Sequence, residues 1–282
     1  MKSFNVILML SSLSVSPVIA AGCYTIDDAA KKGLIKFLIK SKGGYTGNVI
    51  EIKIQNLTAE KLDLKMEAGR RLDSKKENEQ DILVTKAQEF YVSAKQEKSF
   101  NIFGMCCQAH NSSPTQGNKY SIGNMASEKL VKLAKYIDEH KYWENSTAQE
   151  AVWAVSDNNS IGSIYDMDSS IQNGLKRYVS NITGRPIPKY NVTYAEENGG
   201  VAARVTKIDG VFDYTVNAYG HITIAIYDAS GKLVQTLMVD YPHEAGDCKL
   251  FYTFNTRNLP AGTYYTRMSN NGMVEKEMKI EF

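Results

Sequence analysis

The sequence predicts a mainly β protein with a helical segment, an α+β chain in which an N-terminal β-sandwich carries a helical excursion and a second β-sandwich follows. Two observations predict this class. Apolar and polar residues alternate with period two over 49–103 and again over 201–282, whereas the residues between these stretches have helical periodicity. A length of 282 residues suits two modest domains after an export segment.

The first twenty residues have the composition of an export signal. Lys2 precedes an apolar run over about 6–15, and small residues follow at 20–22. The run is too short to cross a bilayer, so we expect a signal peptide over 1–20 and no membrane span afterwards. Cleavage after Ala20 is favoured. In the alternative, residues 20–23 resemble a bacterial lipobox, which would make Cys23 the lipidated first residue of a lipid-anchored chain.

Composition excludes some partners and leaves the cysteines open. Lys and Arg total 33 against 31 for Asp and Glu, a near-neutral balance that gives no electrostatic case for nucleic acid. Four cysteines in an exported chain indicate disulfides, with Cys23 or Cys248 joined to either Cys106 or Cys107. A bond between the two adjacent cysteines would close a strained ring.

The N-terminal strands follow one another with polar breaks between them. In "VIEIKIQN" (49–56), isoleucines alternate with polar residues, as in a half-buried strand. The same pattern continues in "LDLKMEAG", "DILVTK", "EFYVSA" and "KSFNIFGMC", which ends at Cys106. We therefore expect an antiparallel sheet system whose last strand runs out at the cysteine pair.

Two helices are expected directly after these strands. Residues 124–143 place apolar side chains on one stripe, which predicts an amphipathic helix. In "STAQEAVWAVSDN" (146–158), Thr147 and Glu150 fit a capping box. That cap would place Gln149 in the first turn, with Trp153 one turn later on the same face.

A third helix is expected over about 163–181, and it should stop at Gly184. The glycine-rich stretch 196–200 is the predicted boundary between a domain over 21–195 and one over 196–282. Beyond it, about seven short strands at sandwich spacing are expected, two of them joined by a hairpin turn at 228–231.

The stretches "ITIAIYDASGKLVQTL" and "LPAGTYYTRMS" lie in this C-terminal part. Over about 201–282 they resemble the Ig-like sandwich of flagellar hook-capping proteins and of type IX secretion sorting domains in Bacteroidetes. The proline-rich lead-in of the sorting domains is absent. The resemblance implies a C-terminal Ig-like β-sandwich and delivery of a bacterial protein to the outer surface or the medium, with the periplasm as the alternative.

Residues 149–153, "QEAVW", resemble the Gln-x-Ala-Ile/Val-Trp motif of bacterial thioester-domain surface adhesins, and the resemblance covers about 45–160. In that family a cysteine sulfur is joined to the glutamine side chain. Cys107, in a Cys-Gln dipeptide, is the implied partner of Gln149, and Cys106 is the alternative. Ala148 stands where the family usually has threonine.

The resemblance implies an adhesive role. A thioester is an activated acyl group, so Trp153 would serve as a lid against water, and an amine of an unknown surface protein or glycan would attack the thioester. The alternative is a disulfide-stapled structural or interaction module without bond-forming chemistry. We expect no turnover enzyme, no cofactor and no metal, since Cys107 and His110 have no second ligand pair with matching spacing.

Overall fold

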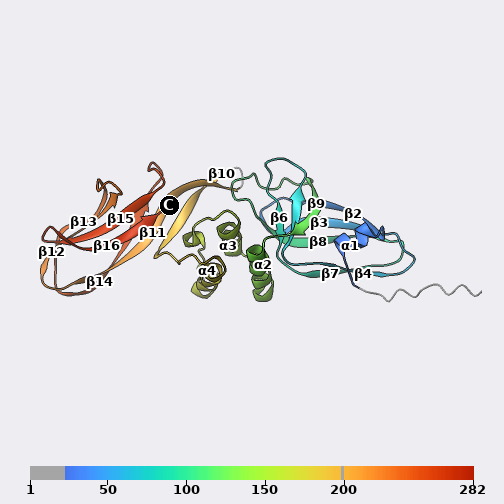
Figure 1. Ribbon diagram of the computed structural model, residues 1–282, viewed down its shortest axis with the longest axis horizontal. Coiled ribbons are helices and arrows are strands. Elements are labelled where there is room, and N and C mark those ends of the chain that lie inside the picture. The colour runs from blue at the N-terminus through green and yellow to red at the C-terminus, as the bar shows by residue number, and fades with distance from the viewer. Residues whose placement is uncertain (1–22, 198–199) are drawn as a thin grey trace, which may run out of the picture.

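The computed structural model describes residues 23–197 and 200–282. The predicted signal peptide lies outside the described residues. Along the long axis of the molecule, the N-terminal strands lie at one end, the helices in the middle and the C-terminal strands at the other end (Figure 1). The expected fold class, mainly β with a helical segment, is confirmed.

The N-terminal strands form a closed barrel with a small sheet beside it. The barrel order is β2-β3-β8-β6-β5-β9, with bounds β2 (Ile35–Ser41), β3 (Thr46–Asn56), β5 (Arg70–Ser74), β6 (Ile82–Val84), β8 (Glu97–Cys106) and β9 (Lys119–Met125). The small sheet has the order β1-β4-β7, with bounds β1 (Tyr24–Thr25), β4 (Leu62–Met66) and β7 (Gln88–Val92).

One apolar core joins these two layers. Ile52 of β3 is fully buried and belongs to the same cluster as Leu64 of β4 and Phe90 of β7. The two layers therefore stack as in a sandwich, although one of them closes on itself. A short helix, α1 (Ile26–Lys31), begins at Thr25, whose hydroxyl accepts a hydrogen bond from the backbone N–H of Asp28.

The helical part packs around a second core. Its elements are α2 (Glu128–His140), α3 (Ser146–Ser156), the 3₁₀ turn η1 (Ile161–Ser163) and α4 (Ser169–Thr183). Leu133 and Ile137 of α2 are fully buried, as the expected stripe requires. The third helix begins later than expected, because the side chain of Asp168 caps it by accepting from the backbone N–H of Ser170. It ends at Gly184, where φ is 75°.

The expected capping box of α3 is wrong. Asn145 is the N-cap, and its side-chain oxygen accepts from the backbone N–H groups of Thr147 and Ala148. The Thr147 hydroxyl is engaged elsewhere, because it bonds the carboxylate of Asp166 at 2.8 Å. A helix has one cap, so the earlier asparagine moves the helix start back by two residues.

The C-terminal strands form two sheets around a third core that contains Phe212, Ile224 and Phe254. The sheet orders are β10-β11-β14 and β13-β12-β15-β16, with bounds β10 (Tyr190–Glu197), β11 (Gly200–Val216), β12 (Gly220–Asp228), β13 (Leu233–His243), β14 (Gly246–Asn255), β15 (Thr263–Asn270) and β16 (Met273–Glu281). Two strands expected over 201–218 are one long strand, β11, and the seventh strand is β10. The predicted boundary at 196–200 falls between β10 and β11, and the domain limits stay a prediction.

No helix in the described part of the chain is both long and apolar enough to cross a membrane.

Candidate functional site

The side chain of Gln149 lies on the backbone of Cys106. The Oε1 atom of Gln149 accepts a hydrogen bond from the Cys106 N–H at 2.9 Å, and its Nε2 donates to the Cys106 carbonyl at 2.8 Å. Both residues are fully buried. A sequence separation of 43 residues is closed here, because β8 ends against the first half of α3. The structure therefore brings together the glutamine and one of the two cysteines, through backbone atoms of the cysteine.

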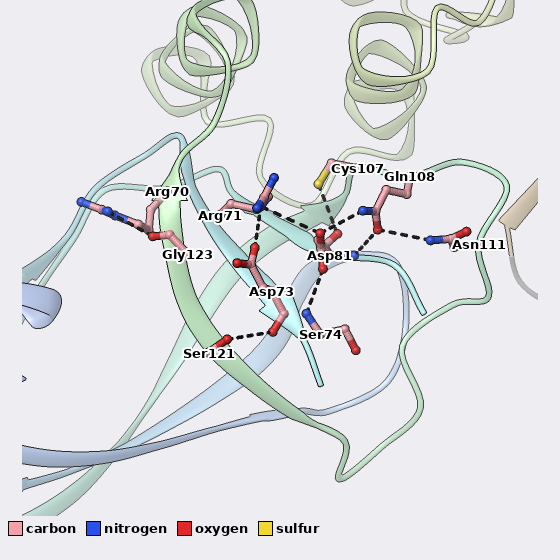
Figure 2. Close-up of polar contacts among 10 residues, drawn as sticks. All are labelled: Arg70, Arg71, Asp73, Ser74, Asp81, Cys107, Gln108, Asn111, Ser121 and Gly123. Atoms are coloured by element: carbon pink, nitrogen blue, oxygen red, sulfur yellow. Dashed lines mark hydrogen bonds and ion pairs between the residues drawn. The ribbon is translucent and has the colours of Figure 1, made fainter. Parts of the chain in front are cut away.

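Cys107 faces a different group. Its sulfur donates to the carbonyl oxygen of Asp81 at 3.4 Å, and its N–H donates to the same oxygen at 3.0 Å (Figure 2). Asp81 lies just before β6, so the last residues of β8 and the entry to β6 are tied together. The Cys107 sulfur is thus already engaged by a backbone acceptor.

Gln108 belongs to the same network in Figure 2. Its Oε1 accepts from the Asp81 N–H at 2.7 Å, while its Nε2 donates to the Asp81 carboxylate at 2.9 Å. The guanidinium of Arg71 lies 3.8 Å from that carboxylate and 2.5 Å from the carboxylate of Asp73. Gln108, the second residue of the Cys-Gln dipeptide, therefore holds the segment that leads into β6.

Trp153 closes the site on the helix side. The residue is 3% exposed, and its ring stacks on Tyr45 with centroids 6.1 Å apart. Its indole N–H donates to the Gln80 side chain at 3.2 Å. Tyr45 also supplies a backbone carbonyl to the Cys106 N–H at 3.0 Å. Aromatic surface and backbone thus cover the same cysteine that Gln149 contacts.

Burial keeps both thiols protonated. It raises the pKa of Cys106 well above its usual value, and the adjacent Cys107 and the buried Glu79 raise it further. Burial also raises the pKa of Cys107 to about 12, with the Asp81 carboxylate adding to the shift and Arg71 opposing it. Since the thiolate is the nucleophilic form, any attack from these sulfurs needs a proton acceptor at the moment of reaction.

The expected disulfides are wrong. All four cysteines, which lie in the described part of the chain, are free. Cys106 and Cys107 are buried in the N-terminal part, whereas Cys23 is exposed before β1 and Cys248 lies in the C-terminal sandwich. Each thiol therefore lies without a disulfide partner, in surroundings that range from fully buried at Cys106 to exposed at Cys23.

Three residues of the site were not expected from the sequence: Tyr45, Gln80 and Asp81. Gln80 ends a polar stretch that reads as a solvated break between strands, and Asp81 is the polar first residue of the expected strand "DILVTK". The one sequence signal for Gln80 and Asp81 is their position, since both residues immediately precede the fully buried strand β6. Within residues 23–197 and 200–282, no group of three or more His, Cys, Asp or Glu side chains is placed to hold a metal ion.

Residues 209–280, which include the second half of β11, β12 to β15 and most of β16, match the family model described as "Secretion system C-terminal sorting domain". This match supports the sorting-domain resemblance of the C-terminal part. The sorting tail indicates export to the outer cell surface or secretion, as expected from the sequence. No curated protein and no solved structure matches the chain.

Proposed function

We propose that this chain is a cell-surface attachment protein whose N-terminal barrel and helices bind a partner outside the cell. The sorting tail supports the location, because an exported chain with a dedicated delivery domain is free to use its other residues on the outer surface. The partner is a surface protein or a glycan. The role is attachment rather than turnover, so each molecule would act once.

In the sharper form of this proposal, Cys106 or Cys107 joins Gln149 in an internal thioester. The observation that carries it is the position of the Gln149 carboxamide on the Cys106 backbone, inside a water-excluded region. A cysteine N–H on the carboxamide oxygen withdraws electrons from the carbonyl carbon, which favours attack by a nearby sulfur.

The atoms of this step balance without an added oxidant. The sulfur attacks the side-chain carbonyl carbon of Gln149, the C–S bond forms and the C–N bond breaks. Ammonia leaves with the thiol proton. An amine of the partner then attacks the same carbon, so that the C–S bond breaks, an amide forms and the thiol is restored.

A second candidate is a binding module that forms no covalent bond. Two observations favour it: the raised pKa values of Cys106 and Cys107, and the hydrogen bonds that engage both the oxygen and the nitrogen of the Gln149 carboxamide. In this form Gln149 is a structural link between α3 and β8. The binding surface would then lie elsewhere on the N-terminal part.

Intact mass spectrometry of the mature chain distinguishes the two candidates. A thioester lowers the mass by about 17 Da, the loss of one ammonia, and methylamine then adds about 31 Da by opening it. Gln149→Ala should abolish the deficit, as should Ala at whichever cysteine reacts. Cys248→Ser is the matched control and should keep the deficit. A wild-type mass equal to that of the chain with four free thiols would exclude the thioester and leave the bond-free module.

A further inference from the structure

A second group of chemically active side chains lies at one end of the C-terminal sandwich. Cys248 of β14 pairs in register with Tyr214 of β11, and His243 ends β13 on the opposite sheet. The Cys248 sulfur lies 3.7 Å from Nδ1 of His243, and the Tyr214 hydroxyl lies 3.0 Å from Nε2 of the same ring. A thiol, an imidazole and a phenol therefore meet from three strands of two sheets.

The group is open to solvent on the side of the sulfur. Cys248 and His243 are half-buried, whereas Tyr214 is only 3% exposed. A hollow of about 310 Å³ is lined by Cys248 and Tyr214. This accessibility separates Cys248 from Cys106 and Cys107, whose thiols are buried.

One tautomer of the His243 imidazole can activate the Cys248 thiol. When Nε2–H of His243 donates to the Tyr214 oxygen, Nδ1 presents its lone pair to the Cys248 thiol. The imidazole is then a base within reach of a nucleophile and is itself held by a third group, which is the pattern of activated cysteines. The charged groups around the hollow are Asp213, Asp247, Lys249 and Lys276, and their charges cancel. The sulfur also lies 3.8 Å from the Gly246 carbonyl oxygen, so the imidazole is the nitrogen base that contacts the thiol.

We propose that Cys248 is a thiol–disulfide exchange site, activated by His243 and positioned by Tyr214, that forms mixed disulfides with disulfide-bearing molecules outside the cell. His243 takes the Cys248 proton, and the thiolate attacks one sulfur of the incoming disulfide. A new S–S bond forms as the old one breaks, and the departing thiolate takes the proton from the imidazolium. The co-reactant is a disulfide, so no separate oxidant is needed.

The test measures the reaction of each cysteine with 4,4′-dithiodipyridine on the reduced chain from Ala21 onward, resolved by peptide mass spectrometry. Cys23, which is exposed, serves as the internal reference thiol. At pH 6.5 we expect Cys248 to react about tenfold faster than Cys23, because an ordinary thiol is only about 1% ionised there. Equal rates for the two cysteines would overturn the proposal.

Two variants separate activation from mere exposure. His243→Gln should lower the Cys248 rate to that of Cys23 at every pH between 6 and 7.5, because the variant lacks the base that takes the thiol proton. Tyr214→Phe keeps the ring packing and should lower the rate partway. An unchanged rate and pH profile in His243→Gln would overturn the role of the imidazole. Because these readouts concern Cys248 alone, they are independent of the mass deficit at Gln149.

Discussion

At the scale of single residues, the position of Gln149 allows it to act both as a thioester partner and as a structural hydrogen-bonding group. Its carboxamide satisfies a buried backbone N–H and a buried backbone carbonyl of Cys106 at the same time. A buried polar group without a partner costs more than its hydrogen bond contributes, so the chain depends on this side chain even if no thioester forms. Only the carbonyl depends on it fully, since the N–H also reaches the Tyr45 carbonyl.

Gln149→Leu should therefore lower the free energy of unfolding by about 2–3 kcal/mol, because the leucine leaves the Cys106 carbonyl buried and unpaired. Urea unfolding followed by fluorescence measures this loss. Gln235→Leu is the matched control, since Gln235 makes a single bond to Thr253 in a partly exposed setting and should cost less than about 1 kcal/mol. Equal losses in the two variants would contradict the structural role of Gln149.

At the scale of elements, α3 carries different chemistry on different faces. Gln149 points to the end of β8, whereas the next residue, Glu150, lines a hollow beside β10 together with Glu196. Lys207 and Asp209 line the same hollow and pair with each other at 2.7 Å. Burial raises the pKa of Glu150 to about 7, a hydrogen bond with Ser163 opposes the shift, and the charge of Glu196 adds to it.

The Glu150 pKa makes stability depend on pH. The folded chain holds this proton more tightly than the unfolded chain, whose glutamate has a pKa of about 4.3. The stabilisation is therefore complete below about pH 4.3 and is lost as the pH rises through about 7. The free energy of unfolding of Glu150→Gln should equal that of the wild type at pH 4 and should exceed it at pH 8 by up to about 3 kcal/mol.

Urea unfolding at a series of pH values checks this expectation. Glu139→Gln, on the exposed side of α2, is the control and should leave the pH dependence of the wild type unchanged. A stability difference between Glu150→Gln and the wild type that stays constant from pH 4 to pH 8 would show that folding does not change the pKa of this carboxyl.

At the scale of the whole molecule, β10 links the helices to the C-terminal sandwich. Tyr194 of β10 accepts a hydrogen bond from the Ser160 backbone N–H in the helical part. Tyr190, at the start of the same strand, bonds both the N–H and the carbonyl of Glu281 near the chain end. One strand thus ties the N-terminal half to the part that matches a sorting domain.

Deleting residues 209–282 should keep the protein inside the outer membrane of a bacterium that has the type IX secretion system, because the deleted part is the sorting tail. Protease added to intact cells should digest the full chain and spare the truncated one. Cys248→Ser, a change within the tail that keeps its fold, should stay accessible to the protease. Surface exposure of the truncated chain would contradict the assignment of sorting to this segment.

Much of the fold could be predicted because its signals are local. The isoleucines of β3 alternate with polar residues, and a buried sheet face needs that alternation wherever the strand pairs. Gly184 ends α4 because a positive φ suits glycine. The predicted start of α3 is wrong because both Asn145 and Thr147 are good caps, and contacts with Asp166 decide between them.

Less of the site could be predicted. The motif indicates Gln149 and Trp153, but Gln80 ends a stretch whose composition is that of a surface loop, and Asp81 is only the polar first residue of an expected strand. They belong to the site because β6 pairs with the end of β8, which is a contact between segments distant in the chain. No local pattern encodes which strand will be that neighbour.

The sequence by itself determined the mainly β class, the helical insertion and the C-terminal delivery domain, because period, helix stops and family motifs are properties of neighbouring residues. Only the tertiary structure decided that the N-terminal strands close into a barrel, that Gln149 rests on Cys106 rather than on Cys107, and that the four cysteines stay free thiols. These outcomes depend on strand pairing and burial across long sequence separations, and packing of the whole chain settles them.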